Sequence, residues 1–258
     1  MKQKLFQSFV RLTGNEKISH FLQGFTSSPL SKPLIRPFQK IYSITDAEMV
    51  RPVASYETLN EFFTRSIDMN LRPIDQHSNA IVSPVDADLT AAGPLHEGTR
   101  FTIKGKTYSI DEVFGSKKIA SSYENGYYYI FYLSPQHYHH FHHPIDGTIR
   151  NRYALGSTSY PVNQLGLTYG DEPFHTNYRL ITELDTNYGN IAIVKVGALN
   201  VNSVQLYCAN EHVEKGKDFG HFSFGSTVVL FLSHQPSFES TVDVGSAVHV
   251  GEKVGQWL

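Results

Sequence analysis

Histidine is concentrated in one short stretch of the chain. Five of the 13 histidines fall within residues 134–144, which read SPQHYHHFHHP. The Ser-Pro start suits a helix cap followed by the first helical position, and Pro144 cannot continue a helix. We therefore expect a short helical turn here, on which His139 and His142, three residues apart, share a face. Two adjacent imidazoles can bind a metal ion or act as acid–base groups near neutral pH.

The metal alternative has few further ligands to draw on. Cys208 is the single cysteine, which excludes a cysteine cluster and an internal disulfide bond, and no His-Glu-x-x-His pattern occurs. The remaining histidines of the stretch, His137, His140 and His143, are expected to be solvated or hydrogen-bonded loop residues, as most polar side chains are. Acid–base chemistry by His139 and His142 is therefore the sharper prediction, and the site is expected to hold no metal.

A second unusual pattern places small polar residues before an apolar strand. Gly225, Ser226 and Thr227 stand directly before Val-Val-Leu-Phe-Leu at 228–232, which reads as a fully buried strand. The ordinary explanation is a bulge or tight bend. The same tripeptide at 156–158 shows that the pattern alone is weak, so a nucleophilic role for the serine needs further support.

A third candidate is an aspartate in the segment SPVDADL, residues 83–89. Asp86 follows an apolar run and a Ser-Pro turn. An aspartate in a turn usually caps its own backbone, whereas in a catalytic triad it orients a histidine. Asp88, two residues further along, is a competing candidate.

These residues need elements to position them, and the pattern of the chain changes near residue 80. Residues 1–48 look helical but are interrupted by prolines, and 55–67 reads as a helix with Ser55 as its cap and three apolar residues on one face. From about residue 80, short apolar runs alternate with Gly, Asn, Asp and Pro. We expect an α+β, mainly β fold, with a helical segment at 1–79 followed by a β-rich, sandwich-like or barrel-like catalytic domain at 80–258.

Charge is distributed unevenly along the chain. Residues 1–40 hold seven Lys and Arg against one acid, Glu16, whereas the whole chain has a formal net charge of −2. Apolar residues recur among the first basic ones at roughly helical spacing, which is typical both of an interfacial helix and of a helix packed on the body. No apolar run reaches the ~20 residues that cross a bilayer, and no secretory signal is visible. The basic segment suggests an anionic partner, either lipid or nucleic acid.

Together these segments resemble the phosphatidylserine decarboxylases, pyruvoyl-dependent enzymes that process themselves. The resemblance runs from about residue 58 to the end and rests on six ordered motifs. They are EFFTRSIDMNLRPID (61–75), VSPVDA (82–87), YLSPQHYHHFHHPIDG (132–147), YPVN (160–163), VGALNVNSV (196–204) and KGKDFGHFSFGSTVVLF (215–231).

The resemblance implies a role for each candidate residue. Asp86, His142 and Ser226 match the self-processing triad, and the cut falls between Gly225 and Ser226. His139 matches the histidine that the family uses chiefly in decarboxylation. The products of the cut are a β chain and an α chain, residues 1–225 and 226–258.

The chemistry of these residue types is consistent with those roles. His142, oriented by Asp86, would take the proton of Ser226 so that its oxygen attacks the Gly225 carbonyl. The resulting ester undergoes β-elimination to dehydroalanine, and tautomerisation and hydrolysis then release ammonia and leave a pyruvoyl group derived from Ser226. This covalent cofactor would form a Schiff base with the amine of phosphatidylserine and act as an electron sink while CO₂ leaves, giving phosphatidylethanolamine. His139 would return a proton to the carbon.

The resemblance also implies partners and a location. The partners would be phosphatidylserine, an anionic membrane surface and the second chain of the same precursor, with a homodimer compatible and nucleic acid not expected. The protein would be peripheral, on the cytoplasmic face of the cell membrane, held by its basic N-terminal segment.

Two positions depart from the family pattern, and two other classes of function stay open. Tyr178 stands where glutamate is usual, and Ala87 replaces a common glycine, which keeps the choice between Asp86 and Asp88 open. The other classes are a metalloprotein built on the histidine cluster and a non-catalytic module that binds anionic lipid.

Overall fold

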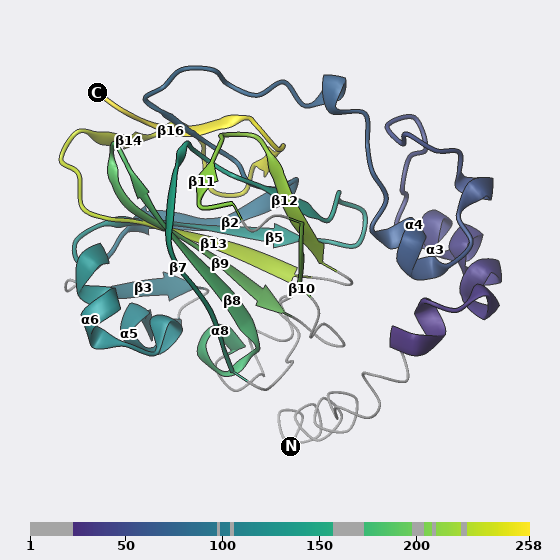
Figure 1. Cartoon of the computed structure of the whole chain (residues 1–258), viewed down its shortest axis with the longest axis horizontal. Coiled ribbons are helices and arrows are strands. Elements are labelled where there is room, and N and C mark those ends of the chain that lie inside the picture. The colour runs from purple at the N-terminus through teal and green to yellow at the C-terminus, as the bar shows by residue number, and fades with distance from the viewer. Residues whose placement is uncertain are drawn as a thin grey trace.

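Antiparallel strands are the most abundant regular structure in the described part of the chain. The structure, a computed structural model, describes residues 23–96, 99–103, 106–156, 173–197, 204–207, 210–222 and 226–258. Helices α3 (Ile35–Ile41) and α4 (Leu59–Phe63) lie to one side of the sheets (Figure 1). The predicted α+β, mainly β class is confirmed.

The helices that lie wholly within the described residues are all short. They are η1 (Pro29–Leu34), α3, η2 (Val53–Ser55), α4, η3 (Met69–Leu71), α5 (Ile110–Phe114), α6 (Lys117–Ala120), η4 (Ser121–Tyr123) and α8 (Pro173–Thr176). The cap of α4 is Thr58, whose hydroxyl accepts a hydrogen bond from the Glu61 amide at 3.0 Å. The prediction of Ser55 as the cap is therefore wrong, because Ser55 ends the separate turn η2. The apolar face predicted for α4 is buried, as expected.

Within the described ranges, the strands form four sheets. They are β1 (Ala80–Val82), β2 (Ala87–Pro94), β3 (Arg100–Ile103), β4 (Lys106–Ser109), β5 (Tyr127–Leu133), β6 (His140–His142), β7 (Gly147–Leu155), β8 (Arg179–Thr186), β9 (Gly189–Gly197), β10 (Val204–Leu206), β11 (His212–Val213), β12 (Asp218–Phe222), β13 (Ser226–Leu232), β14 (Phe238–Ser240), β15 (Ala247–Val248) and β16 (Lys253–Trp257).

One large sheet organises the others. Its order is β11-β7-β8-β9-β13-β5-β2-β15, and the small sheets are β1-β16-β14, β10-β12-β6 and β3-β4. In the described part of the chain the large sheet is open, since β11 and β15 each have one neighbour. The sheets therefore pack in layers rather than as one closed barrel.

Strand β13 lies at the centre of this arrangement. It pairs along its whole length with β5 on one side and β9 on the other. Val228, Leu230 and Leu232 belong to one buried cluster, while Val229 and Phe231 belong to the cluster on the opposite face. Because successive side chains of a strand point to opposite faces, a strand covered on both sides must be apolar at every position. The predicted fully buried strand is confirmed.

Among the described residues, no helix is both long enough and apolar enough to cross a membrane.

Candidate active site

Ser226 is the first residue of the central strand β13. Its Cα pairs with Leu133, the last residue of β5, and with Gly197, the last residue of β9. The amide of Gly197 in turn donates to the carbonyl of Tyr178 at 2.9 Å. Gly225, the other side of the predicted cut, lies outside the described residues. The fold thus places Ser226 where three strand ends meet. Its partner Leu133 directly precedes the histidine segment in the chain.

The histidine segment begins with a turn, in which the His137 amide donates to the Ser134 carbonyl at 3.0 Å, but it is extended at His140–His142. The predicted helical turn that brings His139 and His142 onto one face is therefore wrong. His140–His142 form β6, which pairs with β12. The period of two in a strand separates residues three apart onto opposite faces. The structure follows this alternation, because the Tyr138 ring packs against the rings of His140 and His142 at centroid distances of 4.7 and 5.8 Å. His139 instead contacts Phe63. The two catalytic candidates therefore do not share a face.

His139 is fully buried and fixed in one tautomer. Its Nδ1 lies 2.8 Å from the carbonyl of His137, which can only accept, so Nδ1 carries the proton and Nε2 presents a lone pair. Nε2 is buried with no hydrogen-bond partner among the described residues. Burial and the nearby charge of Arg65 lower the pKa of His139 well below its ordinary value. The ring is therefore a neutral base with one open nitrogen.

The segment Phe62–Arg65 supports this ring from the helical side. The Phe63 ring lies against the His139 ring with centroids 3.9 Å apart. Arg65 Nη2 donates to the carbonyl of Gln136 at 2.6 Å and to that of His137 at 3.1 Å. The His137 carbonyl thus accepts hydrogen bonds from both Arg65 and His139. These bonds fix the backbone just before His139.

The backbone of the histidine segment leads back to the serine. The carbonyl of His139 accepts the amide of Phe222, the last residue of β12, at 3.0 Å. Phe222 stands four residues before Ser226 in the chain. Together with the pairing of Ser226 and Leu133, this bond brings the segments that carry His139 and Ser226 to one place in the fold.

His142 is held at both ring nitrogens. Nδ1 donates to the carbonyl of Gly216 at 2.8 Å, and Nε2 accepts from the hydroxyl of Tyr138 at 3.2 Å. Burial lowers the pKa of His142. The backbone carbonyl of Gly216 therefore fixes the tautomer, a task that the sequence assigned to Asp86.

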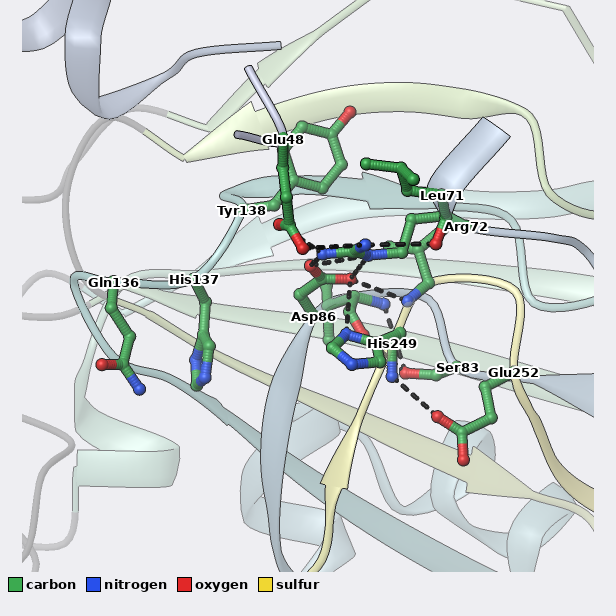
Figure 2. Close-up of polar contacts among 12 residues, drawn as sticks. Glu48, Leu71, Arg72, Ser83, Asp86, Gln136, His137, Tyr138, His249 and Glu252 are labelled. Atoms are coloured by element: carbon green, nitrogen blue, oxygen red, sulfur yellow. Dashed lines mark hydrogen bonds and ion pairs between the residues drawn. The ribbon is translucent and has the colours of Figure 1, made fainter. Parts of the chain in front are cut away.

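Asp86 is buried and bound to an arginine. Its carboxylate accepts from Arg72 Nε at 3.1 and 3.0 Å and from Nη2 at 2.8 Å, and Oδ1 also accepts the amide of Val250 at 2.9 Å. Figure 2 shows Arg72 between Glu48 and Asp86, with His249 beside Asp86. No hydrogen bond or ion pair joins Asp86 to His142 within the described residues.

His140 has a separate set of partners. Its Nδ1 lies 2.7 Å from a carboxylate oxygen of Asp218, and its Nε2 lies 3.1 Å from the carbonyl of Thr64. Both partners are hydrogen-bond acceptors, and they hold the ring from both sides. His140 thereby links the end of α4 to β12; it is hydrogen-bonded, which is one of the two outcomes expected, but it lies in strand β6 rather than in a loop.

A buried lysine near the site escaped the sequence analysis. Lys195 of β9 is fully buried, donates to the Thr182 hydroxyl at 2.9 Å and lies over the rings of Phe219 and Phe141. Burial and the charge of Arg152 lower its pKa well below the ordinary value. The sequence pattern that could have predicted it is a lysine within the otherwise apolar run AIVKVG, because charged residues rarely occur in central strands.

No group of three or more His, Cys, Asp or Glu side chains in the described ranges is arranged to hold a metal ion.

Comparison with known proteins places the chain in a family. The sequence profile described as phosphatidylserine decarboxylase matches residues 59–256. A protein of Halalkalibacterium halodurans named phosphatidylserine decarboxylase proenzyme is 43% identical over 265 residues, covering 100% of both chains. Proteins of the same name from Geobacillus sp. strain WCH70 and Geobacillus kaustophilus are 45% and 43% identical, covering 99% and 100% of this chain and 99% and 98% of their own. The chain therefore belongs to the phosphatidylserine decarboxylase family.

Proposed function

We propose that this protein cleaves itself between Gly225 and Ser226 and then decarboxylates phosphatidylserine to phosphatidylethanolamine. The observation that carries the proposal is the juxtaposition of Ser226 with the buried histidine segment. The serine of the family motif begins a central strand, beside the residues that lead to His139.

The surroundings of Ser226 fit a pyruvoyl group made from that residue. Its partner in β9 is Gly197, which has no side chain to crowd the position. In the histidine segment, the buried Nε2 of His139 lacks a hydrogen-bond partner in the described structure. Buried polar groups are normally satisfied, so such an atom suits a site completed by another group. Once formed, the pyruvoyl ketone supplies an electron sink for the loss of CO₂.

Self-cleavage needs a base for the Ser226 hydroxyl. In the proposal His142 takes this proton at Nε2, the nitrogen that now accepts from Tyr138, while the Gly216 carbonyl holds Nδ1–H. The serine oxygen then bonds to the Gly225 carbonyl carbon as the Gly225–Ser226 amide bond breaks, which gives an ester. Loss of the serine Cα proton then breaks the Cβ–Oγ bond, which frees the Gly225 carboxylate and leaves dehydroalanine. Tautomerisation and hydrolysis by water release ammonia and leave the pyruvoyl group.

Asp86 acts in this scheme through position rather than through direct contact with His142. It anchors Arg72 and the Val250 amide, and Val250 belongs to the future α chain. In the decarboxylation stage, His139 exchanges a proton at Nε2 while Nδ1 stays bonded to the His137 carbonyl.

Membrane attachment through the N-terminal segment is a further part of the proposal. Seven of the ten exposed large apolar residues in the described structure lie between residues 30 and 71: Leu30, Leu34, Ile41, Tyr42, Val50, Met69 and Leu71. The first four of them lie within residues 30–42, which also hold Lys32, Arg36 and Lys40 and no acidic residue. Apolar side chains among cations suit the surface of an anionic membrane, which we place at the cytoplasmic face. A homodimer stays a prediction of the family resemblance.

Three variants test the proposal. Ser226→Ala should leave one uncleaved, inactive chain. His142→Ala should slow self-cleavage, whereas His139→Ala should cleave and then decarboxylate poorly. Normal turnover of phosphatidylserine by Ser226→Ala would overturn the proposed chemistry, and slow cleavage with normal turnover in His139→Ala would overturn the division of work between the histidines.

A further inference from the structure

A cavity of about 270 Å³ lies between the N-terminal segment and the sheets. Its wall includes Ile44 and Glu48 from the segment, and Arg65, Arg72, Asp86 and His137. The volume is just below the ~300–1,000 Å³ typical of sites for drug-sized ligands, so it suits a headgroup rather than a whole lipid.

Arg65 is the cation of this cavity whose charge lacks a close counter-ion. The residue is 4% exposed, and its Nη1 is buried without a hydrogen-bond partner in the described structure. Its other terminal nitrogen, Nη2, donates to two backbone carbonyls, which are neutral. Burial lowers the pKa of Arg65 to about 10, which reflects the cost of holding the charge there. A buried arginine normally has an anionic partner.

The carboxylates of the cavity are already committed to a different cation. Glu48 and Asp86 each lie 2.8 Å from Arg72 Nη2, and Asp86 also accepts the Val250 amide. They attract Arg65 only from a distance. An anion that enters the cavity would therefore find Arg65 available and Arg72 occupied.

His137 adds a second donor to the same wall. Its Nδ1 accepts the amide of Ser134 at 3.0 Å, so the neutral ring carries its proton on Nε2. Burial lowers the pKa of His137, which keeps the ring neutral. The cavity therefore offers N–H groups from Arg65 and His137, the donor set that recognises a phosphate oxygen.

The surroundings of the cavity point to a lipid as the carrier of that phosphate. Exposed apolar residues flank the lining residues along the chain: Tyr42 precedes Ser43, Val50 follows Met49, and Met69 and Leu71 stand between Ile67 and Arg72. A headgroup in the cavity would leave its acyl chains beside these side chains.

We propose that this cavity binds the phosphate group of an anionic phospholipid through Arg65 and His137. That the ligand is a lipid rather than a free anion rests on the proposed function. The phosphate site itself rests only on the contacts of Arg65 and His137. The site lies directly before His139 in the chain, so an occupied headgroup would sit against the backbone that positions the catalytic histidine.

Binding can be measured without any chemistry at Ser226. Full-length Ser226→Ala protein would be titrated in a calorimeter with dihexanoyl-phosphatidylglycerol, with dihexanoylglycerol, which lacks phosphate, and with inorganic phosphate. The phospholipid should bind about tenfold more tightly than either other probe, since it alone combines both features. Arg65→Met in this background should weaken binding about tenfold, the loss expected for a charge-assisted contact.

Arg51→Met is the matched control, because Arg51 lies in the same segment but is exposed and paired with Glu61. It should leave the affinity unchanged. Equal loss in the two variants would overturn the site in favour of general surface attraction. Equal affinity for inorganic phosphate would overturn the lipid assignment.

A measurement without substitution at Arg65 covers the case in which Arg65→Met does not fold. Hydrogen exchange of the Ser226→Ala protein with the phospholipid should show protection at residues 43–49 and 136–138. A second cavity of about 280 Å³, lined by His143, Arg152 and Lys217, serves as the internal comparison. Protection there instead would overturn the proposal. Because neither readout needs cleavage, failure of the site and failure of the proposed function are distinguishable.

Discussion

At the scale of single residues, His139 depends on neighbours that the sequence does not mark as catalytic. Phe63 covers its ring, and Arg65 holds the carbonyl that fixes its tautomer. The family motif that contains both residues is recognisable in the sequence. The support that these residues give to His139 cannot be recognised in the sequence, because α4 and the histidine segment are more than 70 residues apart in the chain.

Phe63→Leu should lower kcat for decarboxylation about tenfold with little change in KM, because His139 loses the aromatic surface that holds its ring. Self-cleavage, assigned to His142, should go to completion. Steady-state kinetics on the mature protein and gel analysis of cleavage measure the two effects. Phe114→Leu, a comparable loss of buried aromatic surface in a different cluster, is the control and should keep kcat. If Phe63→Leu lost stability but kept its kcat, Phe63 would contribute to the stability of the fold and not to the positioning of His139.

His143 predicts a pH dependence of stability. Its ring stacks on Phe219, and burial lowers its pKa to about 3. Between about pH 3 and pH 6.5 the unfolded chain binds this proton and the folded chain does not, so the free energy of unfolding decreases as the pH falls through that window. At pH 5 the loss from this one residue should be about 2 kcal/mol relative to pH 8.

His143→Phe keeps the stacking and removes the titration. Urea unfolding across this pH range should show a smaller loss of stability in the variant than in the wild type. Parallel pH dependences for the two proteins would show that His143 already titrates normally in the folded state.

At the scale of elements, the strands could be predicted from the sequence, and the histidine segment could not. Residues 228–232 are apolar at every position, short and rich in β-branched and aromatic side chains, which favours a strand covered on both faces. In 134–144 the Ser-Pro start and the closing proline suggested a helical turn. Pairing with β12 overrides this local preference, because the tertiary contacts of a three-residue strand are invisible to local pattern.

The partner of Asp86 was missed for a related reason. The motif containing Arg72 and the motif containing Asp86 were both recognised, but sequence spacing does not show which side chains pair. A triad written from family roles therefore placed Asp86 on His142, whereas the structure places it on Arg72.

Gly220 tests the pairing of β12. A Cβ at this position would lie 2.1 Å from the carbonyl oxygen of Gln205 in β10 and 2.6 Å from the Phe141 ring in β6. Gly220→Ala should therefore cost about 2 kcal/mol of stability and slow self-cleavage, since β12 leads directly to the cut. Gly93→Ala is the control, because its nearest contact would be an ordinary 3.8 Å. Equal stability and cleavage in the two variants would contradict this description of β12.

At the scale of the whole molecule, the strands of the predicted α chain pair with strands of the predicted β chain. Within residues 226–258, β13 pairs with β5 and β9, β15 pairs with β2, and β16 pairs with β1. The two chains should therefore stay together after cleavage. Size-exclusion chromatography should elute them as one species in native buffer and as two in concentrated guanidinium. Loss of the α chain in native buffer would contradict the topology.

The central claim concerns a single bond, and intact-mass spectrometry of the purified wild-type protein tests it most directly. The account predicts two chains that end and begin at Gly225 and Ser226, with the second chain carrying a pyruvoyl group in place of its amino-terminal serine, and one uncut chain for Ser226→Ala. A wild-type protein that decarboxylates phosphatidylserine as one intact chain, or a second chain that begins with an unmodified serine, would contradict it.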